Sequence, residues 1–228
     1  MSRRPQSRGK CEYCGEDLAR SAMIRHLAKC LKRLEIIQAS AGSRQPEETL
    51  WHFRVQDRYA KDFWLDLEMR GSATLEKLDA YLRAIWLECC GHLSEFTVGG
   101  WQGYEVGKSR KADDVFSKEP ELLHLYDFGT TSETKITLIG SRKGKAATRH
   151  PIALMARNNM PELSCKECGQ PATFLCIQCL YESEQGNCFL CDEHREDHPH
   201  DEYGEPLPVA NSPRMGMCGY EGPADQPY

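Results

Sequence analysis

The stretch TLWHFRVQDRYAKDFWLDLEMRGSATLEKLDAYLRAIW, residues 49–86, decides the fold class of this chain. Its first part alternates apolar and polar residues, which is typical of strands that bury one face. The alternating apolar residues are Trp51, Phe53, Val55, Phe63, Leu65, Leu67 and Met69. In its last part Thr74, a residue type that often caps the start of a helix, precedes apolar residues at helical spacing. These are Leu75, Leu78, Leu82, Ile85 and Trp86. Strands followed by an amphipathic helix predict an α+β domain with an antiparallel sheet.

The rest of the chain supplies further strand-like runs and the boundaries of the expected units. Strand-like runs continue to PIALMA at 151–156, and glycine and charge clusters at 107–114 and 140–149 are typical of loops. The expected segments are a basic disordered arm at 1–10, a zinc finger at 11–38, a linker at 39–49, a mixed α/β central domain at 50–158 and a Cys/His-rich zinc module at 159–228. The predicted fold class is therefore α+β, with the central domain flanked by small zinc-stabilised modules.

A motif near the N-terminus has the spacing of a zinc finger. It is Cys11-x2-Cys14-x11-His26-x3-Cys30. Zinc takes four thiolate or imidazole ligands in a tetrahedron, and Gly15 allows a tight turn behind the first cysteine pair. Residues 21–34 have helical periodicity, so His26 and Cys30 are expected on one helix face, where they complete the site. A unit this short gains its stability from the metal.

The formal charge of −5 is distributed unevenly along the chain. Residues 1–40 carry a balance of +5, residues 41–160 are neutral, and residues 161–228 carry −10. A basic head can approach phosphates, whereas an acidic tail repels them. We therefore expect the C-terminal module to bind a protein, and nucleic acid to be contacted through the basic residues of the finger. These are Arg20, Arg25, Lys29 and Arg33.

A second cysteine-rich region opens with two close pairs, Cys165-x2-Cys168 and Cys176-x2-Cys179. Their short separation suits a cross-braced module, in which each zinc takes ligands from both halves of the sequence. Eight ligands fill two tetrahedral sites, and ten candidates are present. The later candidates are Cys188, Cys191, His194, His198, His200 and Cys218. Together with the finger, the sequence predicts about three zinc ions, all structural because four protein ligands close each site.

Two ligand assignments fit this spacing. In the first, one site consists of Cys165, Cys168, Cys191 and His194, and the other consists of Cys176, Cys179, His198 and Cys218. The alternative joins Cys188 to Cys191 and His194 to His198 or His200, an arrangement that resembles a B-box. We prefer the first assignment, because Cys191-x2-His194 has the spacing of a zinc knuckle and Cys218 precedes a glycine, as the second cysteine of a knuckle does.

No stretch of the sequence approaches the ~18 consecutive apolar residues of a membrane span. No apolar run follows the basic start, as it would in a secretory signal. Twelve cysteines without such a signal indicate a reducing compartment, where thiols bind metals more often than they pair. We therefore expect a cytoplasmic protein that contacts no membrane.

The middle region contains three blocks in a distinctive order, which are TLEKLDAYLRAIW at 74–86, GHLSEFTVGG at 91–100 and LYDFGTTSETKI at 125–136. Together they resemble the plasmid pRiA4b ORF-3-like family of bacteria, which is associated with plasmids and transposable elements. The residues that match its two motifs are His92, Leu93 and Phe96, and Tyr126, Asp127, Phe128 and Gly129. The Asp, Trp and His that usually follow in the family are Thr130, Ser132 and Thr134 here. The resemblance implies an α+β domain and brings no established reaction with it.

The central domain offers one polar constellation with the chemistry of a metal or acid/base site. It consists of His92, Glu95, His124 and Asp127. Nothing in their spacing makes them converge, so we interpret them as hydrogen-bonded groups of the sheet. Cys89 and Cys90 end the apolar helix, and because adjacent thiols do not easily share one zinc, we expect both to pack in the core.

The sequence contains no clustered carboxylate motif, phosphate loop or nucleophile elbow. We therefore expect no catalytic residues, and a zinc-binding, non-enzymatic interaction protein linked to mobile genetic elements. Two alternatives stay open. One is an enzyme, a hydrolase or nuclease accessory, that acts at a cleft of the central domain. The other is a thiol-based redox or metal sensor that uses spare cysteines such as Cys188 and Cys89.

Overall fold

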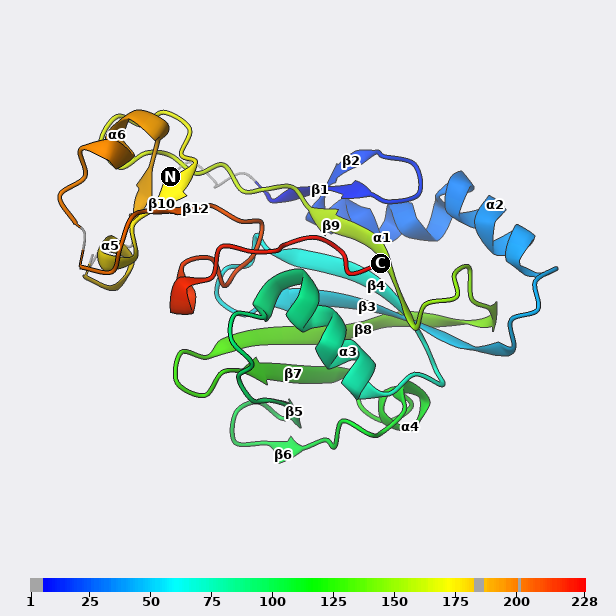
Figure 1. Ribbon diagram of the computed structural model, residues 1–228. Coiled ribbons are helices and arrows are strands. Elements are labelled where there is room, and N and C mark those ends of the chain that lie inside the picture. Colours follow the sequence, from blue (N-terminus) through cyan, green and yellow to red (C-terminus); the bar gives the residue numbers. More distant parts are fainter. Residues whose placement is uncertain (1–5, 183–186, 201) are drawn as a thin grey trace.

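The computed structural model describes residues 6–182, 187–200 and 202–228. Within these residues nine strands form one antiparallel sheet in the order β2-β1-β9-β4-β3-β8-β7-β5-β6 (Figure 1). The strands are β1 (Arg8–Cys11), β2 (Asp17–Ala19), β3 (Glu47–Asp57), β4 (Trp64–Arg70), β5 (Ser94–Val98), β6 (Tyr104–Glu105), β7 (Glu121–Tyr126), β8 (Ser132–Lys145) and β9 (Ile152–Asn158). This sheet, together with the helices around it, confirms the predicted α+β fold class.

Helices and a small second sheet complete the described chain. The helices are α1 (Arg20–Lys29), α2 (Leu31–Ser40), α3 (Leu75–Leu82) with its π-helical continuation η1 (Arg83–Leu87), α4 (Ala112–Phe116), α5 (Ile177–Glu182), α6 (Asp192–Glu196) and the 3-10 turn η2 (Met217–Gly219). The second sheet, in the order β11-β10-β12, contains β10 (Phe174–Leu175), β11 (Phe189–Leu190) and β12 (Leu207–Pro208). It lies in the C-terminal module, at the upper left of Figure 1. No helix among the described residues is long and apolar enough to cross a membrane.

Strand β4 lies at the centre of the fold because it buries both of its faces. Leu65, Leu67 and Met69 are fully buried in a core that they share with α3 and η1. Trp64 is also fully buried, but it packs in a second apolar cluster with Leu27 of α1. Since successive side chains of a strand point to opposite faces, α3 and α1 cover opposite sides of the sheet (Figure 1).

Two carboxylates of β4 lie on the side that the finger covers, where the alternating sequence predicts an exposed face. Asp66 is fully buried and pairs with Arg54 at 2.7 Å. Glu68 pairs with Arg33 of α2 at 3.1 Å and with Arg142 of β8 at 2.7 Å. Buried charges persist only when they are paired, so these contacts let polar side chains lie between the finger and the sheet. The expectation of a half-exposed strand is therefore wrong for β4.

The N-terminal segment belongs to the large sheet. β1 pairs with β9 through the register Gly9↔Asn158 and Cys11↔Ala156. The predicted disordered arm at 1–10 is therefore wrong for residues 8–10, which lie in β1, while residues 1–5 lie outside the described residues. The finger is continuous with the central domain because its first strand satisfies the backbone groups at the edge of β9.

The single helix predicted over residues 21–34 is divided into α1 and α2. Cys30, between them, is extended with φ −60° and ψ 113°. Leu27 and Leu31 are four residues apart and would share one face of a continuous helix. Because of the break, Leu27 is fully buried whereas Leu31 is 74% exposed. Cys30 consequently completes its site from an extended residue rather than from the same helix face as His26.

Two segments predicted to be irregular are partly regular. The predicted linker at 39–49 is reduced to residues 41–46, because α2 continues to Ser40 and β3 begins at Glu47. β8 continues to Lys145, into the predicted loop at 140–149, because it pairs there with the first residues of β3.

The last residues of the chain, the tail at 211–228, return from the C-terminal module to the central domain (Figure 1). Ser212 is fully buried, and its Oγ donates a hydrogen bond to the carbonyl of Trp86 at 2.6 Å. Arg214 is fully buried as well and pairs with Asp127 at 2.6 Å. The unit predicted at 159–228 therefore ends in a segment that packs as part of the central domain.

We expect Gly9→Ala to weaken the docking of the finger on the sheet. A Cβ at this position would overlap the carbonyl oxygen of Arg157 and come within 2.6 Å of the Trp64 ring. Overpacking of this kind costs about 1–3 kcal/mol, so the urea midpoint of unfolding should fall accordingly. Gly107→Ala is the matched control, because nothing lies within 4 Å of its Cβ position. Equal midpoints for the two variants would contradict close packing of β1 against β4 and β9.

Candidate metal centres

Four groups of Cys and His side chains come together among the described residues, and within each group the four ligand atoms lie within 4.8 Å of one another. We name them the N-terminal centre (Cys11, Cys14, His26, Cys30), the first C-terminal centre (Cys165, Cys168, Cys191, His194), the second C-terminal centre (Cys176, Cys179, His198, His200) and the tail centre (Cys89, Cys90, His92, Cys218). Zinc–sulfur bonds of about 2.3 Å in a tetrahedron place two sulfur ligands about 3.8 Å apart. All four groups therefore have the dimensions of a metal site.

The N-terminal centre lies between the finger and the sheet. Cys11 and Cys30 are only 1% and 4% exposed, and their Sγ atoms are 4.0 Å apart. The Sγ of Cys14 is 3.4 Å from Nε2 of His26. Burial raises the pKa of the Cys11 thiol to about 12, so an ion that binds here must displace a firmly held proton. Metal binding at this centre is therefore coupled both to proton release and to the packing of the finger.

Two local features orient these ligands. Gly15, with φ +75°, donates its backbone N–H to the carbonyl of Cys11 at 2.8 Å, which closes the turn between the paired cysteines. The second ring nitrogen of His26, Nδ1, lies 3.3 Å from the carboxylate of Glu16. A carboxylate in this position typically fixes the orientation of a ligating imidazole.

The first C-terminal centre has the same turn and the ligands that the preferred sequence assignment gives it. Gly169, with φ +73°, donates to the carbonyl of Cys165 at 2.9 Å. The Sγ of Cys191 lies 3.8 Å from Sγ of Cys168 and 3.1 Å from Nδ1 of His194. Backbone N–H groups, that of His194 foremost, lower the pKa of the Cys191 thiol and so favour the thiolate that binds metal.

The second C-terminal centre differs from the preferred assignment in one ligand. The Sγ of Cys179 lies 3.3 Å from Nε2 of His198 and 3.2 Å from Nδ1 of His200. His200 therefore occupies the place that the sequence interpretation gave to Cys218. The physical reason is local, since one proline separates the two histidines and their rings meet edge to face with centroids 4.7 Å apart. Cys218 belongs to the tail and lies on the central domain.

Ligands of the two C-terminal centres alternate in pairs along the chain, which is the cross-braced order. The rival ligand Cys188 takes no part in any of the four groups. It is 1% exposed, packs with Leu175 and Leu190 of the small sheet, and burial raises the pKa of its thiol to about 11. Cys188 is thus a neutral residue of the module's apolar core.

The tail centre was not predicted. The Sγ of Cys90 lies 2.9 Å from Nε2 of His92 and 3.6 Å from the Sγ atoms of both Cys89 and Cys218. Cys90 is exposed, so the expectation that it packs in the core is wrong, while Cys89 is half-buried against the core as expected. The sequence carried a weak signal in Cys-Cys-x-His, but the fourth residue lies 126 positions beyond His92 and only the fold reveals it.

The polar constellation of the central domain is divided between two places. His92 belongs to the tail centre, and its Nε2 lies 3.5 Å from the carboxylate of Asp127. His124 is fully buried and lies 2.7 Å from Asp79 of α3, whose pKa is lowered by His124 and Ser94 against the opposing effect of burial. This second group ties α3 to β7 and β5. Glu95, the fourth member, lies in β5 opposite Leu125 of β7.

The basic residues of the finger are not equally available. Arg33 is held in its ion pair with Glu68 and also donates to the carbonyl of Leu27. Arg20 donates to the carbonyl of Lys61 at 2.6 Å. Arg25 and Lys29 are exposed, four residues apart on α1, and within the described part of the chain neither has an ion pair. Of the predicted phosphate contacts, these two are the free ones.

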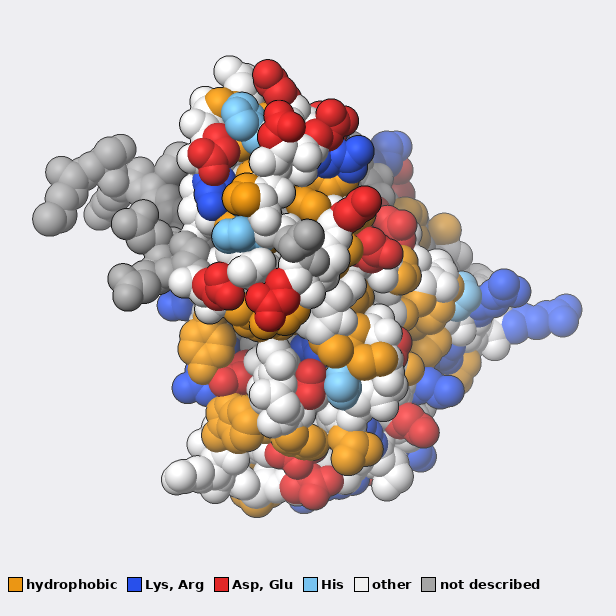
Figure 2. Space-filling view, turned by 60° about the vertical axis from the view of Figure 1, so that its left-hand side comes forward, with side chains coloured by type: hydrophobic (Ala, Val, Ile, Leu, Met, Phe, Trp, Pro, Cys, Tyr) orange, Lys and Arg blue, Asp and Glu red, His pale blue; other side chains and the backbone are white. Residues whose placement is uncertain are grey.

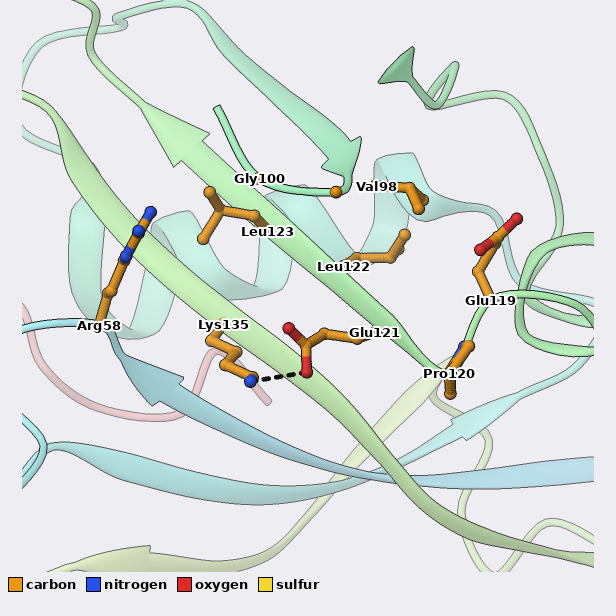
Figure 3. A pocket seen from close by; sticks show the side chains of 10 residues that line it. Arg58, Val98, Gly100, Glu119, Pro120, Glu121, Leu122, Leu123 and Lys135 are labelled. Carbon is orange, nitrogen blue, oxygen red and sulfur yellow. Dashed lines mark ion pairs between the residues drawn. The ribbon is translucent and has the colours of Figure 1, made fainter. Parts of the chain in front are cut away.

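A pocket of the central domain lies over β5, β7 and β8 (Figure 3). Lys135 and Glu121 form an ion pair at 2.6 Å in its wall, and Arg58 pairs with Glu133 at 2.6 Å. The lining residues are Arg58, Val98, Gly99, Gly100, Glu119, Pro120, Glu121, Leu122, Leu123 and Lys135. This lining includes no Cys or His, so the pocket holds neither a thiol nucleophile nor an imidazole.

Comparison with known proteins gives little beyond this geometry. No family model matches the chain, and no curated protein matches it. One solved structure that is similar is a protein of unknown function from Methanosarcina mazei Go1, with 20% sequence identity and a TM-score of 0.39. The match covers 46% of this chain and 66%, just under two thirds, of that protein.

We expect His200→Ala to remove one bound metal ion and Cys188→Ala to remove none. His200 is one of four ligands at the second C-terminal centre, whereas the Cys188 thiol packs only against apolar neighbours. The measurement is the metal content per chain of each purified variant by elemental analysis, with circular dichroism to confirm folding. A full metal content in the His200 variant, with one ion lost from the Cys188 variant, would favour the rival assignment.

Proposed function

We propose that this chain is a zinc-binding interaction protein and not an enzyme, in which metal ions hold binding surfaces in place. One observation carries the proposal. The N-terminal centre and both C-terminal centres each offer four protein ligands at tetrahedral spacing, and a site closed in this way is structural, because a catalytic zinc keeps one position for water or substrate.

The donor sets favour zinc over other common ions. Every member of the four groups is a thiol or an imidazole, and no carboxylate takes part. Such soft and borderline donors suit zinc, whereas magnesium and calcium prefer oxygen ligands. A reducing cytoplasm, in which cysteines stay free to bind metal, is the compartment that fits this chemistry.

The C-terminal module supports binding of a basic protein segment. Its exposed acidic residues are Glu162, Glu167, Glu182, Asp192, Glu193, Glu196, Asp197, Glu202 and Glu205. Figure 2 turns this module toward the viewer, and acidic side chains are spread over its surface. The basic side chains of this part of the chain are largely occupied by contacts within the protein. Lys166 lies 3.3 Å from the Cys179 sulfur, Arg195 stacks on Phe174, and Arg214 is buried.

We expect an arginine- and lysine-rich peptide to bind the module in a salt-dependent way. Replacing Asp192, Glu193 and Glu196 by lysine should weaken binding about tenfold or more, because each reversed exposed charge contributes up to about 1 kcal/mol. Isothermal titration calorimetry at two salt concentrations measures this. The matched control reverses the same number of charges at Glu47, Glu76 and Glu105, which are exposed on the central domain. Equal loss in both variants, or no binding by the natural protein, would contradict the proposal.

A second surface supports contact with a nucleic-acid backbone. Arg25 and Lys29 lie one turn apart on α1 and are free of ion pairs within the described residues, as phosphate-binding side chains need to be. The resemblance to plasmid pRiA4b ORF-3-like proteins would give such contact a setting among bacterial mobile elements. Two cations position a protein on a duplex but do not read its sequence.

We expect the double variant Arg25→Ala, Lys29→Ala to bind duplex DNA more weakly than the natural protein. Each phosphate contact contributes about 0.9 to the slope of log affinity against log salt, so the slope should decrease by about 2. Fluorescence anisotropy over a salt series measures both values. Lys77→Ala with Lys118→Ala is the control, because both side chains are exposed on the central domain. An unchanged slope in the finger variant would exclude this surface.

A further inference from the structure

We propose that the tail centre binds a fourth zinc-type ion, and that this ion fastens the tail and the C-terminal module to the central domain. Three ligands come from the residues after η1, and the fourth, Cys218, comes from the tail. An ion held by both segments adds a bond to a contact that the described chain otherwise makes by packing, hydrogen bonds and the ion pair between Arg214 and Asp127. The site is separate from the three structural centres and does not rest on the proposed function.

The distances within the tail centre are those of a tetrahedral site. The sulfur atoms of Cys89 and Cys218 each lie 3.6 Å from that of Cys90. The adjacent thiols of Cys89 and Cys90 are therefore placed to share one ion, against the expectation from the sequence. Nε2 of His92 lies 2.9 Å from the sulfur of Cys90 and 3.5 Å from that of Cys218. Ligands around one zinc are expected about 3.3–3.8 Å apart, and three of these four distances lie in that range. The Cys90–His92 distance is shorter, so binding of an ion would move these two side chains slightly apart.

The backbone on both sides is shaped to present these ligands. After η1 the chain leaves the helix at Glu88, and Gly91, with φ +78°, turns it so that the adjacent cysteines and His92 share one side. In the tail, Cys218 itself has φ +52°, between Gly216 and Gly219, which also have positive φ. A left-handed conformation is unfavourable for a cysteine, and such residues persist where surrounding contacts fix them, often at functional sites.

Charged and aromatic groups support the thiolate form of the site. The buried guanidinium of Arg214 lies 3.4 Å from the sulfur of Cys89, pairs with Asp127 at 2.6 Å and stacks over the ring of Tyr126. Three thiolates around a divalent ion leave one excess negative charge, and a fixed cation beside them stabilises it. His92 and Tyr126, from the two sequence motifs of the central domain, also meet here, with ring centroids 5.8 Å apart.

The tail centre lies where the module meets the central domain. A Cβ on Gly216 would come within 2.6 Å of Leu175, a core residue of the module, so the turn that carries Cys218 is packed against the module. Met215 contacts the apolar cores of both units. An ion bound by Cys218 therefore fixes the position of the module relative to the sheet, in addition to holding the tail.

Exposure distinguishes this site from the other three. Cys90 and Cys218 are both exposed, whereas each of the other centres contains a buried cysteine. A chelator or an exchanging protein reaches an exposed ion without prior unfolding. The ion at the tail centre should therefore be the first to leave, which would make the attachment of the module sensitive to available zinc.

The test is the zinc stoichiometry of the reduced, full-length protein by native mass spectrometry. We expect four ions in the natural protein and three in Cys218→Ser, in His92→Ala and in the double variant, because both residues serve one ion. His150→Ala, a histidine outside all four groups, should retain four. Three ions in the natural protein with no further loss in either single variant would overturn the proposal. Two ions in the double variant would overturn it as well.

A second measurement separates a bound ion from a disulfide, since the sulfur atoms of Cys90 and Cys218 are close enough to pair on oxidation. Amide hydrogen exchange is followed with zinc and after limited chelation, each in the presence and in the absence of reductant. We expect faster exchange in residues 211–228 when one ion is removed, and no change on adding reductant alone. Exchange that responds to reductant and not to zinc would show a Cys90–Cys218 disulfide and overturn the proposal.

Discussion

Four soft side chains that must converge on one point are the constraint around which this chain is organised. Each Cys/His group draws its members from segments that the sequence separates, and two groups lie where a terminal segment meets the central sheet. Cys11 and Cys30 of the N-terminal centre share an apolar cluster with Trp64 of β4. Cys218 of the tail centre returns to the end of η1. The terminal segments thus pack on the central sheet, and the Cys/His groups determine where they are held.

The finger and α3 can pack on opposite faces of the central sheet because β4 has no solvent-facing side. On one face Leu65, Leu67 and Met69 pack against α3, and the other face presents Trp64, Asp66 and Glu68 to the finger. The two carboxylates are neutralised by arginines from β3, α2 and β8, so removing the finger would leave charge uncovered. The finger is therefore better described as the outer layer of the sheet than as an independent domain, and a metal ion bound at the N-terminal centre would stabilise that layer.

Residue patterns in the sequence were sufficient for the fold class and for the members of the N-terminal group and of one C-terminal group, because each depends on short-range spacing. The alternation in residues 51–69, the cysteine pairs and the helix after Thr74 are all local signals. What the patterns missed depends on long-range contacts. The pairing of β1 with β9, the buried side of β4 and the approach of Cys218 to Cys90 join residues far apart in sequence. His200 was among the candidates but stood outside the preferred assignment, since ten candidate ligands for eight positions leave the choice to the path of the backbone.

Amide hydrogen exchange of the whole protein, with zinc and after complete chelation under reducing conditions, tests the central claim most directly. If the Cys/His groups hold the terminal segments on the central sheet, chelation should abolish protection in β1, α1 and the described residues of the C-terminal module, 165–182, 187–200 and 202–228. Protection in β3, β4, β7 and β8, which share the apolar core with α3, should largely remain. Uniform loss of protection throughout the chain would contradict the account, as would unchanged protection in the terminal segments.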